Sequence, residues 1–337
     1  MNKLDRIGVL VLVDPGLGIT IKDAKAALDA CLEFNGDGLP LSRICVTAQA
    51  TTNTRWPELL DFIQYAAVER KQKSAVRVFS DLQGMTEDKA REIRNLGALL
   101  FGEWFAPSLD QRGIKAMVQQ GISTAGDMLE GIKNSLKAKA LTGIEFQINK
   151  NNFQYVGEFI KSCNQLEIEP HLEMQEVKFS REQKNLADWR REYLDLLPPK
   201  SELQKIARLT GENIPLSPFF CSGNNGLQYG VCNYWFENGV FIRSNGRGGL
   251  LRTACLSDTT PVDSDFVPTT ERLRRNLAHP LLAMRKSLRQ KDMAGTKCAP
   301  CSFWDYCRGG CRAMAFLAAN NDFSPDPNCW YGEKGGK

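Results

Sequence analysis

The feature that most limits the possible fold is an alternation of short apolar segments with amphipathic helical segments between residues 6 and 177. The pattern predicts six strands, at residues 6–13, 42–49, 75–80, 98–104, 141–149 and 170–177. Helices are predicted between them at residues 20–34, 55–71, 86–97, 108–120, 124–139 and 151–167. Such units give parallel strands with right-handed crossovers, hence an α/β fold with a barrel or a doubly wound sheet. Because apolar residues recur at neighbouring strand positions, both faces of the sheet are predicted to be apolar.

Composition and charge narrow the class of protein. The 337 residues are 42% hydrophobic and 24% charged, which is typical of a globular domain in water. The net charge of +4 is small for this length, so no nucleic acid partner is expected. The apolar run at residues 7–13 is too short to span a membrane, and Asp14-Pro15-Gly16 forms a turn behind it instead of a signal-peptide cleavage site. We therefore expect a cytoplasmic protein without a membrane partner.

The 11 cysteines are the second strong feature. Cys31, Cys45 and Cys163 lie in apolar contexts and are expected in the core. The other eight fall late in the chain: Cys221, Cys232, Cys255, Cys298, Cys301, Cys307, Cys311 and Cys329. In a reducing compartment clustered thiols bind metal more often than they form disulfides. Eight thiolates suffice for two four-thiolate sites, and sulfur chemistry alone accepts zinc as well as iron–sulfur clusters.

A change of composition suggests two domains. The chain is helical and charged from residue 180 to 211 and becomes rich in cysteine after about residue 215. We therefore expect a partial barrel at residues 1–214 and a cysteine-rich domain at residues 215–337. The basic segment at residues 271–291 is expected to be a solvated helical linker, with a docking surface for an acidic partner as the alternative.

The segment CAPCSFWDYCRGGCRAMA (residues 298–315), followed by DPNC (residues 326–329), resembles the SPASM domain of radical SAM peptide-modifying enzymes. The resemblance covers about residues 218–333 and implies two auxiliary [4Fe–4S] clusters. Carried over by position, it assigns auxiliary cluster I to Cys221, Cys232, Cys255 and Cys311. It assigns auxiliary cluster II to Cys298, Cys301, Cys307 and Cys329. The gap between Cys232 and Cys255 is longer than the family pattern, which weakens the assignment of Cys221 and Cys232.

The alternating first part resembles the partial (β/α)6 barrel of the same family, but the catalytic motif is missing. That family uses C-x3-C-x2-C after the first strand to bind the cluster that holds S-adenosylmethionine. Here the corresponding stretch, VLVDPGLGITIKDA (residues 11–24), has no cysteine. The Gly-Gly-Glu-Pro segment after the second strand is replaced by residues 48–56. The resemblance therefore implies a degenerate member of the family that does not bind S-adenosylmethionine through a cluster.

Three functions fit these observations. The first is an iron–sulfur accessory subunit that transfers electrons, or holds a peptide substrate, for an intact radical SAM enzyme. The second is an enzyme in its own right that uses an auxiliary cluster or an atypical site, and the third is a binding module with two zinc ions. No catalytic residue can be assigned from spacing, although five polar residues lie near expected strand ends: Glu103, Asp110, Glu145, Asn149 and Glu173.

Overall fold

The described part of the chain forms an α/β fold built on one nine-stranded sheet. The computed structural model describes residues 6–13, 19–36, 39–48, 55–73, 75–174, 191, 194–209, 239–244, 249–252, 264–265, 269–278, 280, 283–284, 287–302, 304–310, 312–327 and 329. The strands, in chain order, are β1 (Val9–Val13), β2 (Arg43–Thr47), β3 (Val76–Ser80), β4 (Leu99–Glu103), β5 (Leu141–Ile148), β6 (Glu169–Met174), β7 (Gly239–Ser244), β8 (Gly249–Arg252) and β9 (Ser264–Asp265). Their order across the sheet is β6-β5-β4-β3-β2-β1-β7-β8-β9.

Helices follow the strands as the sequence pattern predicts. Those of the first part are α1 (Ile21–Asn35), α3 (Trp56–Gln64), α4 (Glu87–Leu96), α5 (Gln111–Gln119), α6 (Ala125–Lys137) and α7 (Val156–Gln165). Those further along are α9 (Lys200–Leu209), α11 (Thr270–Leu277), α13 (Trp304–Cys307) and α14 (Arg312–Ala319). Short 3-10 turns lie at Phe153–Tyr155 and Gln290–Met293. The segment expected as one helix at 55–71 instead changes after α3 into a π-helical stretch, Tyr65–Glu69.

Local signals explain where the helices begin and end. The hydroxyl of Thr20 accepts a hydrogen bond from the backbone N–H of Asp23 at 3.1 Å, and that of Thr86 accepts one from Lys89 at 3.2 Å. Gly97 ends α4 in the left-handed conformation, with φ of 79°. These three positions confirm the helix boundaries predicted from the sequence.

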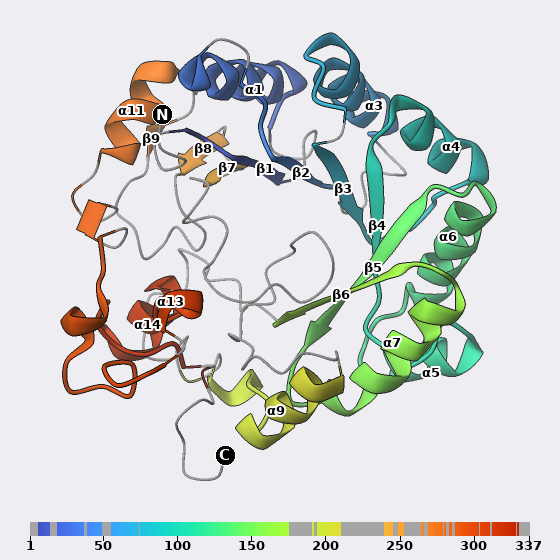
Figure 1. Ribbon diagram of the computed structural model, residues 1–337. Coiled ribbons are helices and arrows are strands. Elements are labelled where there is room, and N and C mark those ends of the chain that lie inside the picture. Colours follow the sequence, from blue (N-terminus) through green and yellow to red (C-terminus); the bar gives the residue numbers. More distant parts are fainter. Residues whose placement is uncertain are drawn as a thin grey trace.

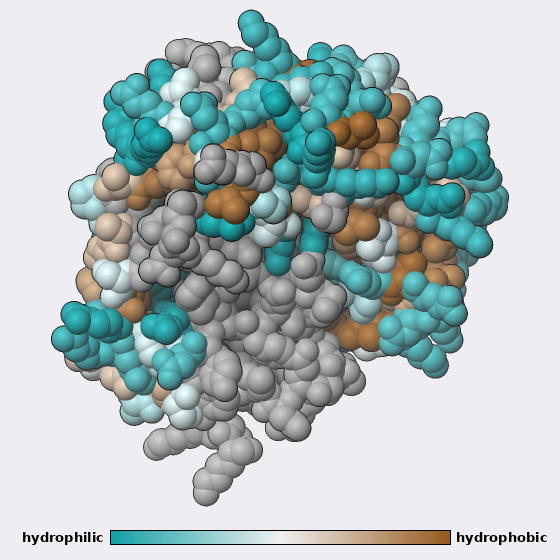
Figure 2. Space-filling view, turned by 45° about the horizontal axis from the view of Figure 1, so that its top comes forward, coloured by the Kyte–Doolittle hydropathy of each residue, from teal (hydrophilic) through white to brown (hydrophobic). Residues whose placement is uncertain are grey.

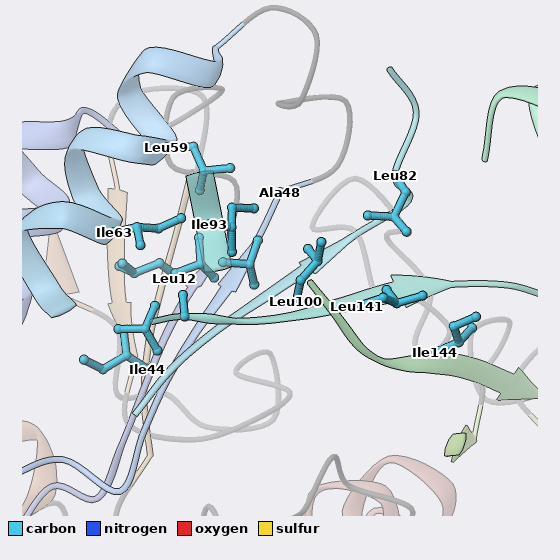
Figure 3. Packing of buried hydrophobic residues seen from close by; sticks show 14 of the residues in the cluster. Leu12, Ile44, Ala48, Leu59, Ile63, Leu82, Ile93, Leu100, Leu141 and Ile144 are labelled. Atoms are coloured by element: carbon cyan, nitrogen blue, oxygen red, sulfur yellow. The ribbon is translucent and has the colours of Figure 1, made fainter. Parts of the chain in front are cut away.

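The first seven strands are parallel, and helices cover the outer face of this curved sheet (Figure 1). On that face Leu12, Ile44 and Leu100 are buried under Ile63 of α3 and Ile93 of α4 (Figure 3). Apolar burial on this scale supplies the main driving force for folding. The arrangement confirms the parallel α/β fold.

The opposite, inner face differs from the sequence expectation. The prediction that both faces are apolar is confirmed only in part. The inner face carries a buried apolar cluster of Val9, Val11, Cys45, Phe79 and Phe101. It also carries five ionisable side chains that are only 2% to 7% exposed: Arg43, Arg77, Glu103, Glu145 and His171. They alternate along each strand with residues of the outer core, as a period of two requires. Burial of charged groups is costly unless they are paired, and a face that gathers several of them is a candidate for a functional site.

The later part of the chain adds to the same sheet. β7 pairs in parallel with β1, and β8 and β9 follow as antiparallel strands. α11 packs against α1 at this end of the sheet, as Figure 1 shows. Residues beyond the expected boundary at 214 therefore extend the barrel sheet, while the boundary itself stays a prediction.

No helix among the described residues has both the length and the apolar character needed to cross a membrane. In the space-filling view hydrophilic side chains cover much of the helical rim, with apolar patches between them (Figure 2).

Candidate functional site

The candidate site is the inner face of β3 to β6, where the strand register places side chains in rows. Phe79 on β3 pairs with Phe101 on β4. One step further along the strands, Glu103 on β4 pairs with Glu145 on β5, and Glu145 pairs with His171 on β6. Partners in neighbouring strands lie about 5 Å apart and point to the same face. Two carboxylates and an imidazole therefore form a row above an aromatic pair, toward the carboxyl ends of the strands, where barrel sites gather.

The aromatic rings form a platform below this row. Phe101 stacks on Phe79 with ring centroids 5.0 Å apart, and it packs against His171 in a T-shaped arrangement with ring centroids 4.7 Å apart. Gly143 makes this possible, because a Cβ there would lie 2.6 Å from the carbonyl oxygen of Glu169 and 3.1 Å from the Phe101 ring. The missing side chain at this position lets Phe101 reach across β5 to His171.

His171 is oriented by its strand neighbour Glu169. The Nε2 of His171 lies 3.2 Å from Oε2 of Glu169, and the His171 side chain is almost fully buried. The hydrogen bond with His171 holds the pKa of the half-exposed Glu169 below its usual range, and Arg77 adds a smaller effect of the same sign. A carboxylate hydrogen-bonded to an imidazole in this way fixes the orientation of the ring.

Glu145 at the centre of the row also has a partner on its own strand. Its Oε1 accepts a hydrogen bond from Nε2 of Gln147 at 3.1 Å. The site as a whole offers carboxylate acceptors, an amide, an imidazole and an apolar platform. These groups can hydrogen-bond a peptide, accept a cationic group, or move a proton.

The structure brings together two of the five polar residues singled out at expected strand ends, Glu103 and Glu145. Asp110 is the N-cap of α5, and its carboxylate accepts hydrogen bonds from the backbone N–H groups of Arg112 and Gly113 at 2.8 and 3.2 Å. Asn149 orders its own loop by accepting a hydrogen bond from the backbone N–H of Asn151 at 2.7 Å. Glu173 is in β6 opposite Gln147, and its side chain is outside the described part.

We predict that Asp110→Ala lowers the free energy of unfolding by about 1 kcal/mol at pH 7, because a helix cap is lost. The hydroxyl of Ser108 and the capped N–H groups lower the pKa of Asp110 to about 2. A depressed carboxylate pKa gives stability that is present above the unfolded value near 4 and disappears as the pH falls through about 2. Urea unfolding at pH 7 and pH 2.5 measures the difference. Asp127→Ala on α6 is the control, and an equal loss in both variants would contradict the capping role.

Five members of the site were not singled out from the sequence: Phe79, Phe101, Gln147, Glu169 and His171. The available signal was the spacing of two in Glu169-x-His171 and Glu145-x-Gln147, which places polar side chains on one face of a strand. In a strand that is otherwise apolar, this alternation marks the inner face.

The second candidate site is the cysteine-rich lobe after α11. Cys298 is buried, and its thiol lies near those of Cys301 and Cys329. Burial raises the pKa of Cys298 to about 11; the two neighbouring thiols add to the increase, while Arg312 and Lys297 oppose it. Three of the four cysteines assigned to auxiliary cluster II therefore lie in one neighbourhood.

The donor set fits an iron–sulfur cluster in kind, since thiolates are its protein ligands. Within the described part of the chain, however, no three Cys, His, Asp or Glu side chains are close enough to hold a metal ion. Electrostatic effects between thiols extend further than metal–ligand distances. The effect of Cys301 and Cys329 on the pKa of Cys298 is therefore consistent with thiols that lie in one neighbourhood but are too far apart to share a metal ion. Cys307 lies in α13 and its side chain is not described. Cys221, Cys232, Cys255 and Cys311 lie outside the described residues, so the ligand assignments stay predictions.

The three scattered cysteines are buried, as predicted. Cys31 and Cys163 belong to the outer core and Cys45 to the inner apolar cluster. Burial raises the pKa of Cys163 to about 12 and that of Cys31 still further. These thiols are inert core residues under ordinary conditions.

No protein-family model and no curated protein matches this sequence. Solved structures do match its fold. Native anSMEcpe with bound AdoMet and the Cp18Cys peptide gives a TM-score of 0.53 at 11% identity, covering 95% of this chain and 93% of that chain. Native anSMEcpe with bound AdoMet gives 0.53 at 12% identity, covering 95% and 94%. anSMEcpe is an anaerobic sulfatase maturase of the radical SAM/SPASM type, and at this identity the likeness shows the fold.

Proposed function

We propose that this chain, which shares the fold of a radical SAM/SPASM maturase, is an iron–sulfur accessory protein that does not itself initiate radical chemistry. Its inner sheet face would hold a peptide substrate, and its cysteine-rich lobe would transfer electrons for an intact radical SAM enzyme. The observation that supports the proposal is the row Glu103–Glu145–His171, because it gathers three ionisable side chains on the inner face near the carboxyl ends of the strands.

The inner face supplies what a peptide site needs. Glu103 and Glu145 offer carboxylate oxygens to backbone or side-chain N–H groups, and the Phe79–Phe101 platform offers apolar area. His171, fixed by Glu169 and Phe101, can donate or accept a hydrogen bond according to its tautomer. Affinity selection from a peptide library should give ligands that lose at least tenfold in affinity with Glu145→Gln. Exposed Glu130→Gln on α6 is the matched control, and equal losses in both variants would count against this site.

The cysteine-rich lobe would supply the redox function. Cys298, Cys301, Cys307 and Cys329 would hold one [4Fe–4S] cluster, and Cys221, Cys232, Cys255 and Cys311 the other. When bound, such clusters supply one-electron transfer at a potential that the surrounding protein sets. The supporting observation is that Cys298, Cys301 and Cys329 share one neighbourhood in a lobe that carries positive charge from Lys297 and Arg312.

We predict that the anaerobically purified protein forms no 5′-deoxyadenosine above background with S-adenosylmethionine and dithionite. The reason is that the segment between β1 and α1 has no thiolate to hold the cluster that would cleave the cofactor. Liquid chromatography measures the product, with an intact radical SAM enzyme as the positive control. Product above background would overturn the claim that initiation is lost.

A second candidate function, an enzyme in its own right, is favoured by the same row of buried acid–base groups. An activity assay without the partner enzyme distinguishes an accessory protein from an independent enzyme, because only the independent enzyme would still convert the peptide. The alternative of a binding module with two zinc ions is distinguished from the iron–sulfur protein by its lack of colour and by analysis of zinc, iron and sulfide. Two zinc ions per chain without sulfide would overturn the iron–sulfur proposal.

A further inference from the structure

The helices described in the cysteine-rich lobe are short, and three polar side chains join its separate backbone segments. Gln290 lies at the start of a 3-10 turn, Lys297 lies next to the first cysteine of the C-x2-C turn, and Arg312 begins α14. Each donates its hydrogen bonds to main-chain carbonyl oxygens. We call these three residues the carbonyl clamp.

Gln290 holds the C-x2-C turn. Its Nε2 donates to the carbonyl oxygen of Cys301 at 2.7 Å and to that of Cys298 at 3.3 Å. The turn is also closed by the N–H of Cys301 on the carbonyl of Cys298, at 3.2 Å. One amide group therefore fixes the two ends of the turn relative to each other, and with them the directions of both thiols.

Arg312 holds the loop that returns to Cys329. Its guanidinium, 3% exposed, donates to the carbonyls of Asp322 at 2.7 Å and Ser324 at 2.8 Å. On its other side it donates to the carbonyls of Gly310 at 3.3 Å and of Gly309. The planar guanidinium suits such a four-way contact better than an ammonium group does.

The two glycines make room for this contact. Gly309 and Gly310 both have φ of 81°, a region that other residues rarely adopt. A Cβ on Gly309 would lie 2.9 Å from Nη2 of Arg312, and one on Gly310 would lie 2.5 Å from Cβ of Asp326. Asp326 in turn starts the last turn, in which the N–H of Cys329 donates to the Asp326 carbonyl at 3.0 Å. The Gly-Gly pair thus lets the Cys329 loop lie directly against the chain after α13.

Lys297 connects the two parts. It precedes Cys298, and its Nζ donates to the carbonyl oxygen of Cys329. The first and last cysteines of auxiliary cluster II are thereby held near each other by a contact that does not involve sulfur. Lys297 and Arg312 also place two positive charges in the neighbourhood of Cys298.

We propose that Gln290, Lys297 and Arg312 are positioning residues that assemble the cysteine-rich lobe before a metal arrives and keep the bound cluster in place. The proposal rests on the proposed iron–sulfur function. The three side chains bind backbone atoms, so they set where the thiols are without being ligands. Residues of this kind around a metal site contribute about 10- to 100-fold to metal affinity. The two cations additionally make the cluster easier to reduce, because they offset its negative charge.

The test uses the anaerobically reconstituted full chain and measures iron, sulfide, the rate of iron release to a chelator, and the reduction potentials. Gln290→Glu, which replaces the donor by an acceptor, is expected to release the iron of one cluster at least tenfold faster. Gln154→Ala is the matched control, because Nε2 of Gln154 also donates to a backbone carbonyl, that of Asn151 at 2.8 Å, but in the barrel. Gln154→Ala should release iron at the wild-type rate.

Arg312 separates geometry from charge. Arg312→Lys keeps the positive charge but loses the planar guanidinium that contacts several carbonyl oxygens. This variant should therefore release iron faster, while the reduction potential of the iron–sulfur cluster that is still bound stays unchanged. Arg312→Gln removes both the positive charge and the guanidinium contacts. In this variant iron release should be faster, and the reduction potential of the bound cluster should also become more negative. Circular dichroism confirms that the barrel is folded in each variant. Wild-type release rates and potentials in all three variants would refute the clamp, whereas wild-type protein without iron and sulfide would refute the iron–sulfur function itself.

Discussion

Replacement of Cys298 by alanine is expected to halve the iron and sulfide content of the anaerobically purified protein, from about eight of each per chain to about four. Cys298 is the buried member of the group that includes Cys301 and Cys329, so its loss leaves auxiliary cluster II with an incomplete set of thiolates. Because the resemblance to the SPASM domain assigns the other cluster to different cysteines, that cluster should remain. Its absorption and electron paramagnetic resonance spectra should persist at about half of the original intensity.

The control for this experiment is Cys163→Ala in α7, which removes a buried thiol far from the lobe in sequence. It should keep the full iron and sulfide content, although it loses some core packing. Full iron content in Cys298→Ala would show that this cysteine is not a ligand. Loss of all iron would show that the two clusters do not assemble independently.

The second large effect is expected for Gly131→Ala in α6, which should lower the free energy of unfolding by about 3 kcal/mol. A Cβ at this position would lie 2.0 Å from the carbonyl oxygen of Leu82. Leu82 cannot move away easily, since it is buried with φ of 58° and its N–H donates to the hydroxyl of Ser80 at 3.0 Å. The helix must therefore shift away from the loop that follows β3.

Denaturant unfolding measures the change, and Gly126→Ala is the matched control. Gly126 lies in the first turn of the same helix, and a Cβ there meets no atom within 4 Å. Alanine is a better helix former than glycine, so this control should be neutral or more stable by up to about 1 kcal/mol. Equal stability of the two variants would show that α6 does not need its close approach to Leu82.

Much of the fold could be predicted from the sequence because its determinants are local. The period of the apolar residues located six strands and their helices, and the hydroxyls of Thr20 and Thr86 located two helix starts. The parallel arrangement followed from the spacing between strands and the handedness of crossovers. Each of these signals lies within a few residues of the feature that it determines.

The remaining features depend on register between distant segments. The row Glu103–Glu145–His171 exists only because three strands are aligned in one particular way, and no local pattern specifies that alignment. The same holds for the platform of Phe101, which needs Gly143 on the neighbouring strand. The role of Asp110 illustrates the opposite case, since a polar residue near a strand end proved to be a helix cap.

The pairing of β1 with β7 has a consequence for how the protein must be made. β1 reads Val-Leu-Val-Leu-Val, and it pairs with β2 on one side and with β7 on the other. On the ribosome β1 and β2 emerge early, whereas Gly239, the partner of Val9, is synthesised much later. Until then β1 is an uncharged, strongly β-forming edge that other nascent chains can join. A shortened chain that ends at residue 214 would keep that edge permanently, so we expect it to aggregate more readily than the full chain, in which β7 covers β1.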